Sequence, residues 1–169
     1  SGSPPLAGPA CREAAHELCA AAGACIDSGL PPPTGHSPPF YSALCVAGTV
    51  VTTDYATLGT FVSECDGVTD RSGKSCVTAV SRYCASTGAV SGFGPVASDG
   101  DSVTVTCLTD ATMLRTTPEI LQGFASRCVP DPVECQSASR GFCESLGHTG
   151  GFGPVEVSGN DLDVVCVGP

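Results

Sequence analysis

The sequence contains no tryptophan, a single methionine and a single lysine, and aromatic residues make up only 5% of its 169 positions. Large side chains bury the most apolar surface per residue, so their scarcity predicts a thin hydrophobic core. No apolar run approaches the roughly 20 residues that a membrane-spanning helix requires. The sequence therefore predicts a protein that does not insert into a membrane and needs stabilisation beyond its core.

Positive charge is also scarce. Seven Lys and Arg residues stand against 17 Asp and Glu residues, which gives a formal net charge of −10. Proteins that bind nucleic acid gather Lys and Arg on one surface to contact phosphates. The composition therefore argues against a nucleic-acid partner.

Cysteine, by contrast, is abundant. An even number of 12 cysteines is typical of a disulfide framework formed in an oxidising compartment. The closest pair, Cys19 and Cys25, has five residues between its members and no following pair of histidines, which does not match a zinc site. We predict no metal or cofactor, and an extracellular or cell-surface location. Abundant Ala, Gly, Val and Pro further suggest a bacterial source with a GC-rich genome.

One cysteine-containing segment is repeated. The spacing Cys-x7-Cys-x22-Cys and the string Gly-Phe-Gly-Pro-Val occur at 76–107 and again at 135–166, and Cys11-x7-Cys19 begins a more divergent copy. The incomplete third copy predicts either a continuation beyond Pro169 or a closing hairpin. The expected organisation is a linker or cloning remnant at 1–10, a first repeat at 11–65, a stapled connecting loop at 66–75, a second repeat at 76–128 and a third repeat at 129–169.

Each repeat is predicted to contain a short helix, a β-hairpin and a second short helix, which makes the fold class α+β. In the second copy the apolar residues Cys76, Ala79, Val80, Tyr83 and Cys84 have helical spacing. The turn dipeptides at 99–100 and 159–160 are each followed by alternating apolar residues, as expected of hairpins. A Thr-Pro pair at 117–118 is a typical helix start.

The repeat also suggests how the cysteines pair, although sequence alone allows many pairings. Two cysteines recur together in every copy, so we pair them within the copy, and we pair the last cysteine of one copy with the first of the next. A rival scheme that pairs first and last cysteines within a copy leaves Cys135 without a partner. The predicted bridges are Cys11–Cys25, Cys19–Cys45, Cys65–Cys76, Cys84–Cys107, Cys128–Cys135 and Cys143–Cys166.

No pattern of catalytic residues stands out, and we predict that the protein is not an enzyme. Residues 67–75 resemble a phosphate-binding loop, but they contain one residue too many and follow no apolar strand. No serine lies in a G-x-S-x-G context. Asp99, Asp101, Asp161 and Asp163 surround the hairpin turns, where a calcium site is one reading and turn chemistry is the other.

The Gly-Phe-Gly-Pro-Val strings allow two interpretations. Their Phe rings could fill the core, or they could form a repeated surface for stacking on a sugar or peptide. A second candidate surface is the Pro-rich segment 29–41, which is unique to the first copy. The candidate ligand-binding residues are Tyr83, Phe93, His148, Phe152, Phe40 and Tyr41.

These features favour a non-enzymatic extracellular binding or adhesion module, with a carbohydrate or an extracellular protein as its ligand. Repetition, acidity and disulfide density support this hypothesis. One alternative is a secreted proteinase inhibitor that presents the Pro-rich loop 29–41 to a protease. Another is a structural spacer within a larger surface protein.

Overall fold

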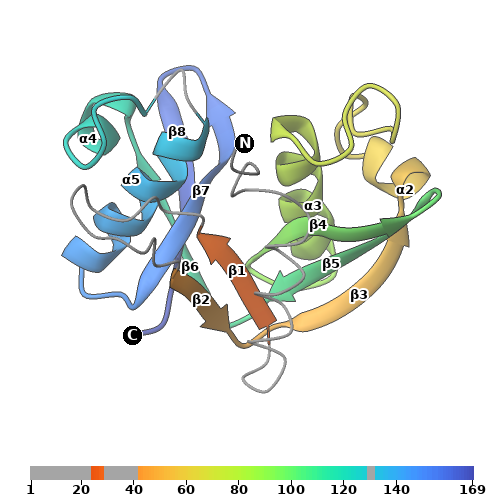
Figure 1. Cartoon of the computed structure of the whole chain (residues 1–169), viewed down its shortest axis with the longest axis horizontal. Coiled ribbons are helices and arrows are strands. Elements are labelled where there is room, and N and C mark those ends of the chain that lie inside the picture. Colours follow the sequence, from red (N-terminus) through yellow and green to blue (C-terminus); the bar gives the residue numbers. More distant parts are fainter. Residues whose placement is uncertain (1–23, 29–41, 129–131) are drawn as a thin grey trace, which may run out of the picture.

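The computed structural model describes residues 24–28, 42–128 and 132–169 (Figure 1). Helices and antiparallel sheets occur together, which confirms the α+β class. The elements in chain order are β1 (Ala24–Ser28), β2 (Ser42–Val46), β3 (Thr49–Asp54), α2 (Tyr55–Gly59), α3 (Lys74–Ser86), β4 (Ser91–Asp99), β5 (Ser102–Leu108), β6 (Ala111–Thr116), α4 (Pro118–Gln122), α5 (Pro132–Ser145), β7 (Gly150–Ser158) and β8 (Asp161–Val167).

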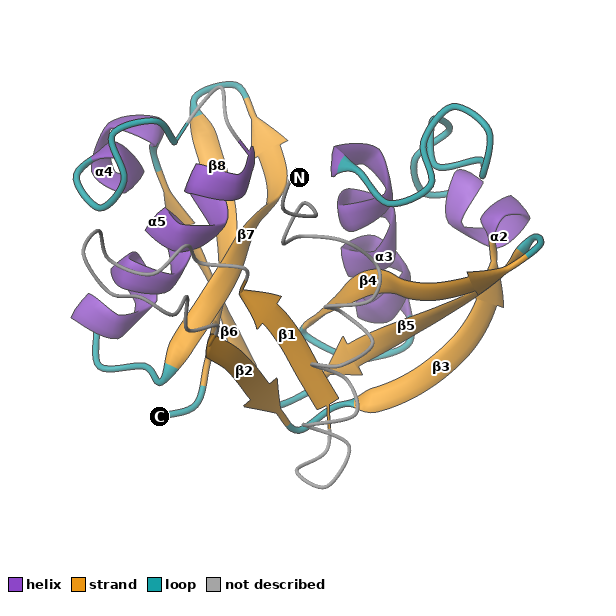
Figure 2. Ribbon diagram, in the orientation of Figure 1, coloured by secondary structure: helices purple, strands orange, loops and turns teal. Residues whose placement is uncertain are grey.

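Two stretches of chain have the same order of elements. We call residues 49–108 the N-terminal unit and residues 111–167 the C-terminal unit; each runs strand, short helix, long helix, strand, strand. Their three-stranded antiparallel sheets have the orders β3-β5-β4 and β6-β8-β7. The hairpin of β1 and β2 precedes them as a two-stranded sheet (Figure 2).

The helices predicted at 76–84 and 135–143 and the hairpins that follow them are present, whereas the helix predicted at 11–19 lies outside the described residues. The predicted unit omits one strand in each three-stranded sheet. β3 and β6 run antiparallel to the last strand of their own hairpins, at β5 and β8. Each structural unit therefore begins with a strand and a short helix that precede the long helix. The repeat defined from the cysteines begins instead at the long helix. The hairpins themselves pair as predicted, with turns at 99–102 and 158–161.

The long helices bury the faces that their apolar spacing predicts. On α3, Cys76, Ala79, Val80 and Cys84 are buried in a cluster with the strand residues Val103 and Val105. A matching cluster in the C-terminal unit joins the α5 and β8 side chains of Cys135, Ala138, Cys143, Leu162 and Val164. Four cysteines belong to each of these two clusters, so disulfide sulfur fills part of the space that larger apolar side chains would otherwise occupy.

Four of the predicted disulfides are confirmed. The Cys65–Cys76 and Cys128–Cys135 bridges join the end of each short-helix segment to the start of the long helix. The Cys84–Cys107 and Cys143–Cys166 bridges join the long helix to the last strand of each sheet. All eight cysteines of these four bridges are buried. The predicted Cys11–Cys25 and Cys19–Cys45 bridges involve residues outside the described part of the chain.

The two units meet in a third apolar cluster. Leu108 from the N-terminal unit packs there with Phe152, Val155, Val165 and Val167 from the C-terminal unit, and Phe93 packs against them. Beside this cluster α3 lies against β7, where the Thr78 hydroxyl donates a 2.7 Å hydrogen bond to the Val155 carbonyl. Arg82 of α3 also forms an ion pair with Glu156 of β7. Apolar packing and polar contacts together fix the two units against each other.

Candidate functional site

The two Gly-Phe-Gly-Pro-Val strings lie at corresponding register shifts in the edge strands β4 and β7, and each contains a cis Gly–Pro bond. Their rings meet edge to face at the junction of the units, with the Phe93 and Phe152 centroids 5.9 Å apart. Phe152 is only 7% exposed. Its ring face is therefore occupied by the protein itself, which favours the core-filling interpretation of this position.

The other predicted ligand-binding residues do not join this pair. Tyr83 is half-buried and makes an edge-to-face contact with Phe61, at a centroid distance of 6.0 Å. The Nδ1 atom of His148 lies 2.8 Å from the carbonyl oxygen of Gly168, which holds the end of the chain against the end of α5. Phe40 and Tyr41, with the rest of the Pro-rich segment 29–41, lie outside the described residues.

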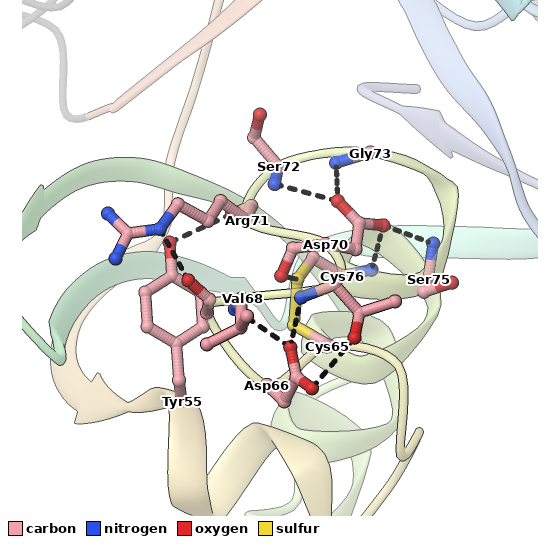
Figure 3. The surroundings of a disulfide bond; sticks show 12 residues. Tyr55, Cys65, Asp66, Val68, Asp70, Arg71, Ser72, Gly73, Ser75 and Cys76 are labelled. Carbon is pink, nitrogen blue, oxygen red and sulfur yellow. Dashed lines mark hydrogen bonds between the residues drawn. A yellow bond between two sulfur atoms is a disulfide. The ribbon is translucent and has the colours of Figure 1, made fainter.

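The best-defined surface feature is the loop between Cys65 and Cys76, which we call the stapled loop (residues 66–75; Figure 3). Asp66 organises its first half. One carboxylate oxygen of Asp66 accepts hydrogen bonds from the backbone N–H groups of Val68 (2.8 Å) and Thr69 (2.6 Å), and the other accepts from the Thr69 hydroxyl (2.9 Å). These bonds favour the charged carboxylate and lower the pKa of Asp66 below its ordinary value of 3.8.

Asp70 organises the second half in the same manner. Its Oδ1 atom accepts from the backbone N–H groups of Ser72 (3.0 Å) and Gly73 (2.6 Å), and its Oδ2 atom accepts from Ser75 (3.0 Å) and Cys76 (3.4 Å). The last two of these groups belong to the first turn of α3, where unpaired N–H groups and the helix dipole attract an anion. A carboxylate from the chain already occupies that position, so the loop does not act as a phosphate cradle.

A buried tyrosine forms the floor of the loop. The Tyr55 hydroxyl donates a 2.9 Å hydrogen bond to the carbonyl of Arg71, and the Arg71 guanidinium lies 5.7 Å from the centre of the Tyr55 ring. Arg71 Nε also donates to the carbonyl of Gly67. Gly67 has a φ of +79°, and an added Cβ would come within 2.6 Å of the Tyr55 ring. The loop is therefore fixed by a disulfide at its ends, two carboxylates along its length and a ring beneath it.

The stapled loop presents an unusual set of side chains to solvent. Val68 is 91% exposed, and Arg71 and Lys74 of the same loop are also exposed, while both loop carboxylates accept hydrogen bonds from the loop or from the start of α3. The corresponding segment of the C-terminal unit is shorter, because its cysteines are separated by 7 positions rather than 11. Sequence reasoning identified the stapled loop but missed the exposed valine and the roles of the aspartates; the spacing Asp-x3-Asp within a closed loop was the available signal.

A small cavity lies between the ends of β2 and β8 and the residues just before β6 and β7. Its volume is about 130 Å³, below the 300 Å³ or more that is usual for small-molecule sites. Its lining consists of Cys45, Val46, Ala47, Asp110, Thr149, Val167 and Gly168. The cavity is too small to enclose a substrate of ordinary size.

Among the described residues, no group of three or more His, Cys, Asp or Glu side chains is placed to hold a metal ion. Asp163, considered above for calcium, accepts two hydrogen bonds from the Arg115 guanidinium, at 2.8 and 3.1 Å. Within the same ranges, no helix is long and apolar enough to cross a membrane. Comparison of the chain with protein-family models, with curated proteins and with solved structures found no match.

Proposed function

We propose that this protein is a non-enzymatic extracellular binding module that contacts a protein partner through the stapled loop. One observation carries the proposal. The loop is closed by a disulfide and ordered by hydrogen bonds to two carboxylates, yet it leaves the side chain of Val68 91% exposed. Four buried disulfides are consistent with an extracellular or secreted protein.

Rigidity supports this assignment. A loop that is already ordered loses little conformational entropy when it binds, so more of its contact energy appears as affinity. Asp66 and Asp70 accept seven hydrogen bonds within the loop or at its border with α3. Such ordering exceeds what a simple connection between α2 and α3 requires, since the equivalent pair of cysteines in the C-terminal unit is separated by 7 positions rather than 11.

The exposed side chains indicate the chemistry of the partner. Val68 would enter an apolar depression, and the exposed Arg71 and Lys74 of the same loop would face carboxylates of the partner. A protein surface provides both features, whereas a glycan is usually held by stacking on exposed aromatic faces. Phe152 is buried against Phe93, so a glycan partner receives less support from this pair of rings.

The experiment is a binding screen of the oxidised protein against arrays of extracellular proteins and of glycans, with two matched variants. Val68→Ser removes the exposed loop valine, and Val157→Ser removes a valine of β7 that is 41% exposed and remote in sequence. Burying a valine side chain contributes about 1.5 kcal/mol or more, so Val68→Ser should weaken binding about tenfold. Val157→Ser should bind as the unmodified protein does.

Three outcomes would contradict the proposal. The first is the absence of any protein ligand, which would favour the spacer hypothesis. The second is a glycan ligand whose affinity Val68→Ser leaves unchanged. The third is turnover of a ligand rather than its retention, which would identify an enzyme.

A further inference from the structure

β3 forms an open edge of the sheet in the N-terminal unit. The strand order β3-β5-β4 gives β3 one neighbour, and it lies on the outer rim of that sheet in Figure 2. Alternate residues of an edge strand direct their N–H and C=O groups outward. Among the described residues, no backbone hydrogen bond beyond those to β5 involves residues 49–53. The outward groups are therefore available to another strand.

β3 has none of the features that usually block a sheet edge. Natural edge strands are commonly protected by charged side chains, proline or a bulge. Residues 49–53 are all threonine or valine, and their register with β5 runs without a shift. Val50 is 48% exposed, and Thr49 and Thr52 are exposed as well. Exposed, neutral and β-branched residues of this kind favour pairing with a further strand.

The corresponding edge of the C-terminal unit is different. β6 is the end strand of the order β6-β8-β7, and it carries Arg115. The Arg115 guanidinium forms ion pairs with Asp161 and Asp163 of the hairpin beside it. A charged side chain on an edge strand discourages pairing with a further strand. Of these two edges, β3 is therefore the one suited to pairing.

The sequence of β3 matches a second copy of itself. In an antiparallel pairing centred on Val51, this residue lies opposite Val51 of the second copy, and Val50 lies opposite Thr52. Cross-strand pairs of β-branched residues stabilise a sheet, whereas like charges placed opposite each other destabilise it. Asp54, the only charged residue of β3, would lie opposite Gly48. In a chain of net charge −10, this strand offers a contact in which no acid faces another acid.

We infer that β3 is a self-association edge, at which two copies of the protein pair antiparallel about a two-fold axis. The pairing joins the two three-stranded sheets of the N-terminal units into one continuous sheet. Because each copy contributes the same strand, the contact is closed and association stops at a dimer. One pair of strands buries a small area, so we expect a weak dimer with a Kd of about 10 µM to 1 mM. The inference does not depend on the binding proposed for the stapled loop.

The test is sedimentation velocity of the oxidised full chain, at concentrations from about 5 µM to about 1 mM. The sedimentation coefficient should rise with concentration from the value of a monomer toward that of a dimer. Raising the salt concentration from about 0.05 M to about 0.5 M should strengthen the association, because salt screens the repulsion between two acidic chains.

Val50→Lys is the test variant, and Met113→Lys is its matched control. In the paired strands the two introduced lysines would lie diagonally across the two-fold axis, about 7–8 Å apart, and would repel each other. Met113 is 37% exposed, and it lies opposite Val165 on β6 as Val50 lies opposite Thr106 on β3. Both substitutions change the net charge equally. Val50→Lys should raise the Kd at least about fivefold over that of Met113→Lys, which should dimerise as the unmodified protein does.

Hydrogen exchange of the unmodified protein gives a second measurement that needs no variant. The outward amides of residues 49–53 should exchange more slowly at concentrations where the dimer forms, because they become bonded to the second copy. Exchange of these amides that does not change with concentration would overturn the pairing.

Three results of the sedimentation experiments would also overturn the inference. The first is a protein that stays monomeric at the highest concentration. The second is a dimer that Val50→Lys and Met113→Lys weaken equally, since another surface would then form it. The third is a dimer that dissociates at high salt, which would indicate a contact between opposite charges rather than between neutral strands.

Discussion

Replacing Gly151 with alanine should strongly destabilise the protein, although the change adds a single methyl group. The new Cβ would lie 2.3 Å from the sulfur of Cys143 and 2.6 Å from the carbonyl oxygen of Val165. Cys143 is bonded to Cys166, and Val165 belongs to the central strand β8, so neither neighbour can move freely. Either the disulfide or the strand must shift by more than an ångström.

Two contributions set the magnitude. Overpacking a core costs about 1–3 kcal/mol when the structure can adjust. If the Cys143–Cys166 bridge cannot close, the chain also loses the constraint on a loop with a sequence separation of 23, worth about 3.5 kcal/mol. We therefore expect Gly151→Ala to lower the free energy of unfolding by at least about 3 kcal/mol, a large fraction of the total for a domain of this size.

The assay is urea unfolding followed by far-ultraviolet circular dichroism, with free thiols counted in the folded state. Gly159→Ala is the matched control, because Gly159 lies in the turn of the same hairpin with nothing near its added Cβ. Its φ of +62° predicts a cost of about 1 kcal/mol from the backbone alone. The steric reasoning would be refuted by a Gly151→Ala protein that keeps all its disulfides and loses less stability than Gly159→Ala.

Three further predictions concern the junction of the units and the stapled loop. Phe93→Ala should lower the free energy of unfolding by about 2–3 kcal/mol in urea titrations, because it removes the ring that covers Phe152; a loss below about 0.5 kcal/mol would contradict the packing at the junction. Asp66→Asn should flatten the acid side of the stability curve. The pKa of Asp66 is lowered by folding, so its contribution is present above the unfolded pKa and is lost as the pH falls below about 3.8. Thermal melts from pH 2 to 7 that are parallel for both proteins would contradict this role. Arg82→Ala should cost less than about 1 kcal/mol, with an effect that shrinks in high salt, because the ion pair with Glu156 is partly exposed; a larger and salt-independent loss would show that packing dominates there.

Much of the fold follows from spacing within the sequence. The repeated Cys-x7-Cys places both cysteines on one helix face, and that face is buried in α3. Because the same cysteines recur in each copy, the four described bridges could be paired by counting. The strand β3 was missed, although Thr49, Val50, Val51, Thr52 and Thr53 are all β-branched and favour extended backbone. Its pairing with β5 joins residues about 50 positions apart, a non-local contact that local patterns do not encode.

The candidate site was less accessible to sequence reasoning. A closed loop between Cys65 and Cys76 follows from the pairing, but hydrogen bonds decide which of its side chains face solvent. Asp66 and Asp70 look like exposed acids in the sequence, yet their carboxylates accept bonds from the backbone of the loop. The roles of Phe93 and Phe152 depend on how two units pack together, which a single repeat cannot reveal.

The most direct test of the stapled loop as a preorganised contact surface is backbone ¹⁵N relaxation of the oxidised protein. The amides of Val68, Thr69 and Gly73 are hydrogen-bonded to loop carboxylates, so we predict order parameters of about 0.85, as in a rigid backbone. Values below about 0.6 at these amides would describe a flexible connection and contradict the proposal that this loop presents Val68 to a partner.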